Sequence, residues 1–181
     1  RKGDIFLLEN FLDDLNKKAE KEIKKRKTKG DPEKVAIAAF KYMITKNSPN
    51  KTITFNSEEA MKFEGDTGPY LLYSYARAKS ILRKTEKFSD MNISKLEEKE
   101  VSLLKKLSQF PEVVVSSYNN LNPSLIANYS YQLAQIFNEF YHDCQVVGSE
   151  QETFRLSLVK TFAQVLKNSL SLLGIETLEE M

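Results

Sequence analysis

The sequence contains few of the residues from which enzymes build metal sites and nucleophilic centres. It has one cysteine, Cys144, and one histidine, His142. A single cysteine excludes a disulfide within the chain and is typical of a reducing compartment, so we expect a cytoplasmic location. No second cysteine or histidine completes a ligand set, so no metal site is expected. Gly-x-Ser-x-Gly and phosphate-binding Gly-x-x-x-x-Gly-Lys-Ser/Thr motifs are also absent, so we expect no catalytic residues in this chain.

Long apolar runs and a strong net charge are missing as well. No window approaches the roughly 18 apolar residues of a membrane span, and no signal-peptide core follows the N-terminus, so we expect no membrane partner and no secretion. The formal net charge of +2 is too small to attract nucleic acid by bulk electrostatics. The chain begins at Arg1 rather than at methionine, so we interpret it as part of a longer protein.

Apolar residues recur at helical spacing and predict an all-α fold, a bundle of four or five amphipathic helices with negligible strand content. A first helix is expected from Glu9, and a second from an Asp31 cap to about Lys46. Further helices are expected over residues 57–61, 69–87, 96–110, 113–118, 125–144 and 158–173, with Ser57 as a cap and Gly174 as a C-terminal stop. The only short extended run is 53–55, and a polar linker is expected at 88–94.

The one strongly basic segment runs from Lys17 to Lys29. It carries eight lysines and arginines against Glu20 and Glu22. Such a run could bind RNA phosphates, since each neutralised phosphate releases a counterion. A solvated helix surface rich in lysine and glutamate is the alternative, and the sequence leaves both open.

The segment 63–84 is a turn with two glycines that leads into a helix beginning near Pro69. At about 100° per residue, one arc of this helix is aromatic and cationic and the opposite arc is apolar. The first arc holds Tyr70, Tyr73, Arg77 and Lys84, and the second holds Leu71, Tyr75, Ala78 and Leu82. Rings next to positive charge suit unpaired bases and their phosphates. Alternatively, the two tyrosines of the first arc only pack against a neighbouring helix.

The amino-acid sequence of this segment resembles a motif of arginyl-tRNA synthetases, Gly-Asp/Asn-Thr-Gly-Pro-Tyr-x-x-Tyr-x-x-x-Arg. In that family the motif joins the catalytic and anticodon-binding domains. The matching residues are Gly65, Asp66, Thr67, Gly68, Pro69, Tyr70, Tyr73 and Arg77, while Leu72 and Ser74 stand where many members carry Gln and Ala. Arg1-Lys2-Gly3-Asp4 resembles the residues that follow the family's ATP-contacting loop. The C-terminal run from Arg155-Leu156-Ser157-Leu158 through Val165–Ile175 to Met181 is also similar to the family.

The resemblance implies a helical bundle of the class I synthetase anticodon-binding type. It implies that residues 1–62 follow a catalytic domain of the same chain and that 63–181 form a linker helix plus the bundle. The parent enzyme would join arginine to tRNA(Arg) with ATP and magnesium, whereas this chain would bind the anticodon loop and be inactive alone. The RNA-binding residues implied are Tyr70, Tyr73, Arg77, Tyr141, Gln145 and Met181, with Gln145 standing where some members place a tryptophan. A helical protein–protein interaction module without RNA binding is the alternative.

Overall fold

The computed structural model describes residues 8–85, 93 and 95–181, and these residues form helices and loops without a strand, which confirms the all-α prediction. The Arg1–Asp4 match lies outside the described residues, as does the 88–94 linker apart from Ile93. The helices are α1 (Leu8–Arg26), α2 (Pro32–Thr45), α3 (Ser57–Ala60), α4 (Gly68–Arg83), α5 (Glu98–Ser108), α6 (Phe110–Asn119), α7 (Ser124–Asp143) and α8 (Glu152–Leu172). Among the described helices, none combines the length and the hydropathy needed to cross a membrane.

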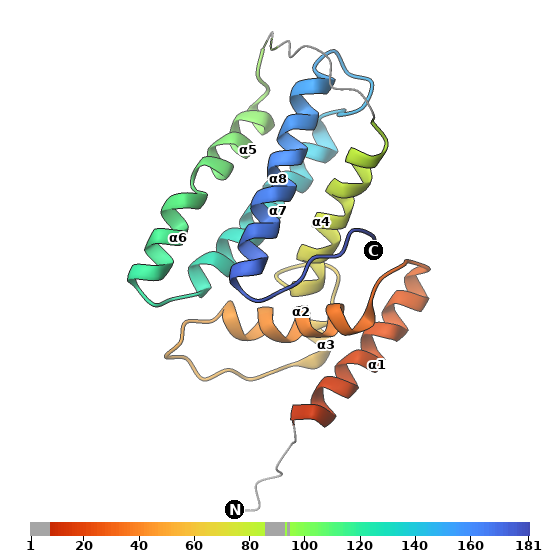
Figure 1. Ribbon diagram of the computed structural model, residues 1–181, viewed down its shortest axis with the longest axis vertical. Helices are drawn as coiled ribbons and strands as arrows, with labels where there is room; N and C mark the ends of the chain where they lie inside the picture. Colours follow the sequence, from red (N-terminus) through yellow and green to blue (C-terminus); the bar gives the residue numbers. More distant parts are fainter. Residues whose placement is uncertain (1–7, 86–92, 94) are drawn as a thin grey trace, which may run out of the picture.

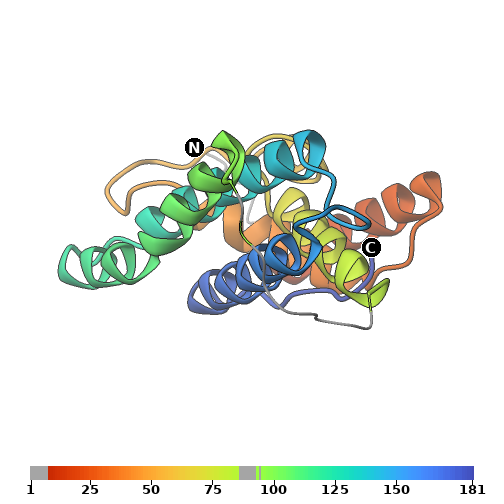
Figure 2. The ribbon, with the colours of Figure 1, turned by 90° about the horizontal axis from the view of Figure 1, so that it is seen from above.

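Helices α4, α5, α7 and α8 form the bundle, and α2 lies across its lower end in Figure 1. Seen from above in Figure 2, α5 and α6 lie on one side and α1 on the other. Within the core, the rings of Phe137 on α7 and Phe162 on α8 stack with centroids 3.7 Å apart. One cluster of buried residues runs from Leu15 on α1 to Leu178 near the C-terminus, so residues on both sides of the expected boundary at 62/63 share a core.

The start of α2 follows the sequence prediction. The Asp31 carboxylate accepts hydrogen bonds from the backbone amides of Glu33 and Lys34 at 3.0 and 3.4 Å, and so caps the helix. Tyr42 is fully buried, and its hydroxyl donates to the Asp66 carboxylate at 2.6 Å and to the carbonyl of Ala127 on α7 at 3.1 Å. Burial raises the pKa of this hydroxyl far above its usual range. Tyr42 therefore joins α2 to α7 and to the turn before α4.

Three residues of the motif before α4, Gly65, Thr67 and Gly68, have structural roles in the turn. A Cβ on Gly68 would lie 2.2 Å from the carbonyl oxygen of Ala38, so α4 begins in direct backbone contact with α2. The Thr67 hydroxyl accepts from the Tyr70 amide at 3.3 Å and caps the helix, and Gly65 has a φ of +73°. Helix α4 thus begins at Gly68, one residue earlier than predicted, and ends at Arg83 rather than near Lys87.

Helix α7 presents Tyr129, Leu133, Phe137 and Phe140 to the core. Several apolar residues elsewhere are not buried, in part because the shorter α5 and α6 pack on one side only. Leu96, Leu104, Val115, Tyr118 and Leu172 are exposed; Leu96 precedes α5 and Leu172 is the last residue of α8. The cap of α3 is Asn56 rather than Ser57, because the Asn56 side chain accepts from the amides of Glu58 and Glu59.

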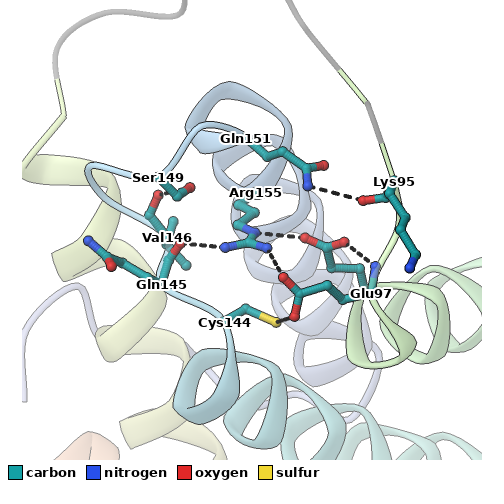
Figure 3. A network of polar contacts seen from close by, with 9 residues as sticks. Lys95, Glu97, Cys144, Gln145, Val146, Ser149, Gln151 and Arg155 are labelled. Carbon is teal, nitrogen blue, oxygen red and sulfur yellow. Dashed lines mark hydrogen bonds and ion pairs between the residues drawn. The ribbon is translucent and has the colours of Figure 1, made fainter.

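An ion cluster centred on the buried Arg155 joins α5 to α8 and to the loop between α7 and α8 (Figure 3). We call Arg155, Glu97, Glu100 and Cys144 the Arg155 cluster. Arg155 Nε donates to Glu100 at 2.7 Å, and its terminal nitrogens donate to Glu97 at 2.5 Å and to the Gln145 carbonyl at 2.8 Å. Glu100 in turn accepts from the backbone amide of Glu97. Arg155 thereby neutralises both carboxylates that lie beside the cysteine.

The Arg155 cluster also contains the described group of side chains best placed for a cation, Glu97, Glu100 and Cys144. The Arg155 guanidinium already pairs with both carboxylates, so magnesium does not fit there. Burial, followed by the charge of Glu97, raises the pKa of the Cys144 thiol to about 11. The raised pKa keeps the thiol protonated well above neutral pH. The cluster is a packing element because Arg155 of α8 bonds to Glu100 of α5, to Glu97 and to the loop after α7.

Candidate nucleic-acid interface

An open pocket of about 390 Å³ lies against α4, and it brings together four of the six residues expected to bind RNA. Tyr73 and Arg77 come from α4, Tyr141 from the end of α7, and Met181 from the C-terminus. We call this the α4 pocket. Its other lining residues are Lys29, Ala76, Ser80, Ile81, Arg83, Lys84 and Glu180. Rings and cations from three separate parts of the chain thus face one open space.

Arg77 is the centre of this arrangement. Its terminal nitrogens donate to the Tyr73 hydroxyl at 2.9 Å and to the Asn138 side-chain oxygen at 2.8 Å. Its guanidinium carbon lies 4.8 Å from the centroid of the Tyr73 ring and 5.6 Å from that of Tyr141. A guanidinium has five N–H donors, so these two bonds leave donors for a ligand. Arg77 is therefore held in place by neutral partners and keeps its charge.

Asn138 on α7 connects the residues of α4, and sequence reasoning missed it. Its amide nitrogen donates to the Tyr70 hydroxyl at 2.8 Å and to the Ser74 hydroxyl at 3.1 Å, while its oxygen accepts from Arg77. We call Tyr70, Tyr73, Arg77 and Asn138 the Arg77 cluster. A single polar residue next to Phe137 gives no sequence signal for this role, because it depends on how α7 meets α4.

Tyr70 does not line the α4 pocket. Its ring packs edge-on against Tyr131 of α7, with centroids 5.8 Å apart, and its hydroxyl is bonded to Asn138. Tyr70 thus makes the helix contact that the sequence left open as an alternative. It also supports Asn138, which holds Arg77.

Gln145 lines a second pocket of about 390 Å³, which shares Ile81, Lys84 and Tyr141 with the first. Its side-chain amide donates to the Val147 carbonyl at 3.0 Å, and this bond fixes its direction. The two pockets adjoin because they have these three residues in common. All six predicted residues therefore lie in or directly behind one surface.

The basic segment divides between two places. Lys29 lines the α4 pocket, whereas Lys18, Lys21, Lys25 and Arg26 line a separate groove of about 420 Å³. In that groove Glu22 pairs with Lys25 and Arg26, each at 3.6 Å, which reduces the positive charge. Only Lys29 among these five thus adds its charge to the α4 pocket.

Comparison with known proteins identifies this helical arrangement. Residues 71–181 match the model of the DALR anticodon binding domain. The chain is 38% identical over 193 residues to the arginine–tRNA ligase of Clostridium perfringens (strain 13 / Type A), covering 100% of this chain and 34% of that protein. It is 43% identical over 157 residues to the arginine–tRNA ligase of Pyrococcus abyssi (strain GE5 / Orsay), covering 82% of this chain and 25% of that protein.

Solved structures agree. The Thermus thermophilus arginyl-tRNA synthetase superposes with a TM-score of 0.93 at 31% identity, over 100% of this chain and 33% of that one. The Plasmodium falciparum arginyl-tRNA synthetase superposes with a TM-score of 0.85 at 27% identity, over 98% of this chain and 34% of that one. The chain spans about a third of the length of these proteins. On this evidence, the chain belongs to the DALR anticodon binding domain family.

Proposed function

We propose that this chain is the anticodon-binding portion of an arginine–tRNA ligase and that the α4 pocket receives unpaired bases of the tRNA(Arg) anticodon loop. The observation that carries the proposal is the convergence of Tyr73, Arg77, Tyr141 and Met181 on one pocket. Sequence-specific proteins read RNA mainly in single-stranded loops, where bases are free to stack on rings and guanidinium planes. Aromatic and cationic groups from distant segments supply both kinds of contact here.

Each residue has a physical role in this proposal. The Tyr73 and Tyr141 rings offer stacking surfaces, and Arg77 between them offers a plane and a charge. Lys29 and Lys84 at the rim neutralise backbone phosphates. Gln145 offers hydrogen bonds to a base edge in the adjoining pocket. Tyr70 acts from behind, by fixing Asn138.

The remaining functions belong to the longer protein. Residues 1–62 follow the catalytic domain of the same chain and 63–181 form the linker helix and RNA-binding bundle. ATP and magnesium act in the preceding catalytic domain, in the cytoplasm, and this chain alone gives no aminoacylation. The shared core across 62/63 means that the catalytic domain would be attached to a continuous helical body.

Tyr73→Ala tests the proposal. Base stacking on a ring typically contributes about 1–3 kcal/mol, so we expect affinity for a tRNA(Arg) anticodon stem-loop to fall by about five- to a hundredfold. Tyr118→Ala is the matched control, because Tyr118 is exposed on α6, away from the pocket. Fluorescence anisotropy gives the affinities and thermal melts show that both variants fold.

Two results would contradict the proposal. The first is equal affinity of the wild-type protein for the arginine stem-loop and for one with an unrelated anticodon. The second is a lower melting temperature of Tyr73→Ala with unchanged affinity. The second result would make Tyr73 a packing residue and would favour the protein-interaction module.

A further inference from the structure

The C-terminal tail, residues 174–181, is bound along the side of α4 rather than extending into solvent. Gly174 turns the chain out of α8 with a φ of +67°, and its carbonyl accepts a hydrogen bond from Lys41 on α2. Ile175 and Leu178 are then buried in the core, with 2% and 8% of their surface exposed. In Figure 1 the C-terminus lies beside α4, near the loop that follows α1. The tail therefore has a fixed path toward the α4 pocket.

Glu179 is 58% exposed at its side chain, and three contacts join it to α4. Its carboxylate accepts a hydrogen bond from the Tyr75 hydroxyl at 3.1 Å and pairs with Lys79 at 3.1 Å. Its backbone carbonyl accepts from Arg83 at 2.9 Å. Tyr75, Lys79 and Arg83 are spaced four residues apart on α4, so they form a row along one face of the helix.

The protonation behaviour of Glu179 agrees with this geometry. Burial alone would raise the pKa of its carboxyl group, but hydrogen bonds from Lys79 and Tyr75 outweigh it, and the pKa lies below its ordinary value. The carboxylate is therefore charged at neutral pH, when both partners hold it.

Met181 follows Glu179 by two residues and forms part of the pocket wall. It lines the α4 pocket, packs against the core, and lies 3.9 Å from the position that a Cβ on Gly30 would take. Arg83 contacts both Glu179 and Glu180 and lines the same pocket. The row on α4 and the loop after α1 thus contact the final residues of the chain from two sides.

We infer that Glu179 is a positioning residue that seats Met181 in the wall of the α4 pocket and so sets RNA affinity without facing the RNA itself. This inference rests on the proposed function for the identity of the ligand. Its structural half, the seating of Met181, does not require RNA and is measured separately.

The seating is tested by methionine methyl NMR on the protein labelled with ¹³C at methionine methyl groups. The sequence has four methionines, and a variant lacking Met181 assigns its resonance. We expect Glu179→Ala to narrow the Met181 signal and move it to the position of a free methionine. Glu179→Gln keeps an acceptor for Tyr75, so its Met181 signal should lie between those of wild type and Glu179→Ala. Glu112→Ala, an exposed change on α6 with the same change in net charge, should leave the signal where it is.

The effect on binding is tested with the tRNA(Arg) anticodon stem-loop. We expect Glu179→Ala to weaken binding by about three- to tenfold, as an unseated tail must be ordered again on binding. Deletion of Met181 should weaken binding at least as much. The variant that combines Glu179→Ala with deletion of Met181 should lose no more RNA affinity than the deletion alone, because Glu179 acts only through Met181.

The outcomes separate the two claims. An unchanged Met181 signal in Glu179→Ala would overturn the inference, and so would an additive loss in the combined variant. If the wild-type protein bound no RNA while the Met181 signal still responded, the proposed function would fail and the seating of Met181 by Glu179 would stand.

Discussion

Two arginines of this chain have contrasting surroundings, and the contrast separates a packing element from the proposed binding element. The Arg155 side chain is 7% exposed and pairs with two carboxylates, those of Glu97 and Glu100. Arg77 is half-buried, and among the described residues it bonds to the Asn138 amide and the Tyr73 hydroxyl and forms no ion pair with a carboxylate. The charge of Arg155 is neutralised by carboxylates of the protein, whereas Arg77 is held by neutral groups that leave its charge available.

Hydrogen bonds to neutral groups orient a cation for an anionic ligand without neutralising its charge. Orienting Arg77 beforehand removes much of the entropy cost that a free arginine would pay on binding. A carboxylate partner would give the same orientation but would cancel the charge.

Removing Arg155 should damage the fold and not the binding surface. In Arg155→Ala, the fully buried Glu100 loses its partner, and an uncompensated buried charge typically costs about 3–5 kcal/mol. We expect chemical denaturation to show a loss of that size. RNA affinity measured on the folded protein at low temperature should stay within about twofold of wild type. A folded, stable variant with weakened RNA binding would contradict the division of roles.

Cys144 of the Arg155 cluster should make the stability of the protein depend on pH. Its pKa of about 11 in the folded protein exceeds the ordinary value of 9.0, so folding favours the protonated thiol. Below pH 9 both states are protonated and this contribution is fully present. As pH rises through 11, we expect the free energy of unfolding to fall by about 2–3 kcal/mol from this group. Cys144→Ala should remove this part of the decrease in unfolding free energy at alkaline pH. Chemical denaturation at several pH values measures the decrease in both proteins. An equal decrease in wild type and Cys144→Ala would refute the prediction.

Asn138→Asp would make Arg77 resemble Arg155. The new carboxylate would accept from Arg77 and pair with its charge. We expect affinity for the anticodon stem-loop to fall by about three- to tenfold while the melting temperature changes by a few degrees at most. Asn119→Asp, on the exposed end of α6, makes the same change in net charge and should have little effect. Equal losses in the two variants would show that total charge alone matters.

The sequence predicted the parts of this account that depend on local spacing. Tyr73 and Arg77 are four residues apart on a helix, so their contact follows from helical geometry. The same reasoning found the cap at Asp31, a helix over most of α7 and the stop at Gly174. The resemblance to arginyl-tRNA synthetases implied Tyr141 and Met181, which spacing alone did not connect to α4.

What the sequence could not predict depends on contacts between distant segments. Helical spacing placed Tyr70 and Tyr73 on one arc but could not show that Tyr131 and Asn138 of α7 cover Tyr70. The need for glycine at position 68 appears only when Ala38 of α2 lies against it. Glu179 looked like one of many acidic surface residues until the tail was placed beside Tyr75 and Lys79.

The central claim is that the α4 pocket, organised around Arg77, binds the arginine anticodon. It is tested most directly by titrating wild type and Arg77→Lys with an arginine anticodon stem-loop and with a stem-loop of unrelated anticodon. Lysine keeps the charge but loses the planar group that bonds to Tyr73 and Asn138. We expect wild type to prefer the arginine stem-loop and Arg77→Lys to lose at least about tenfold in affinity for it, with unchanged affinity for the unrelated stem-loop. Equal affinity of both proteins for both RNAs would contradict it.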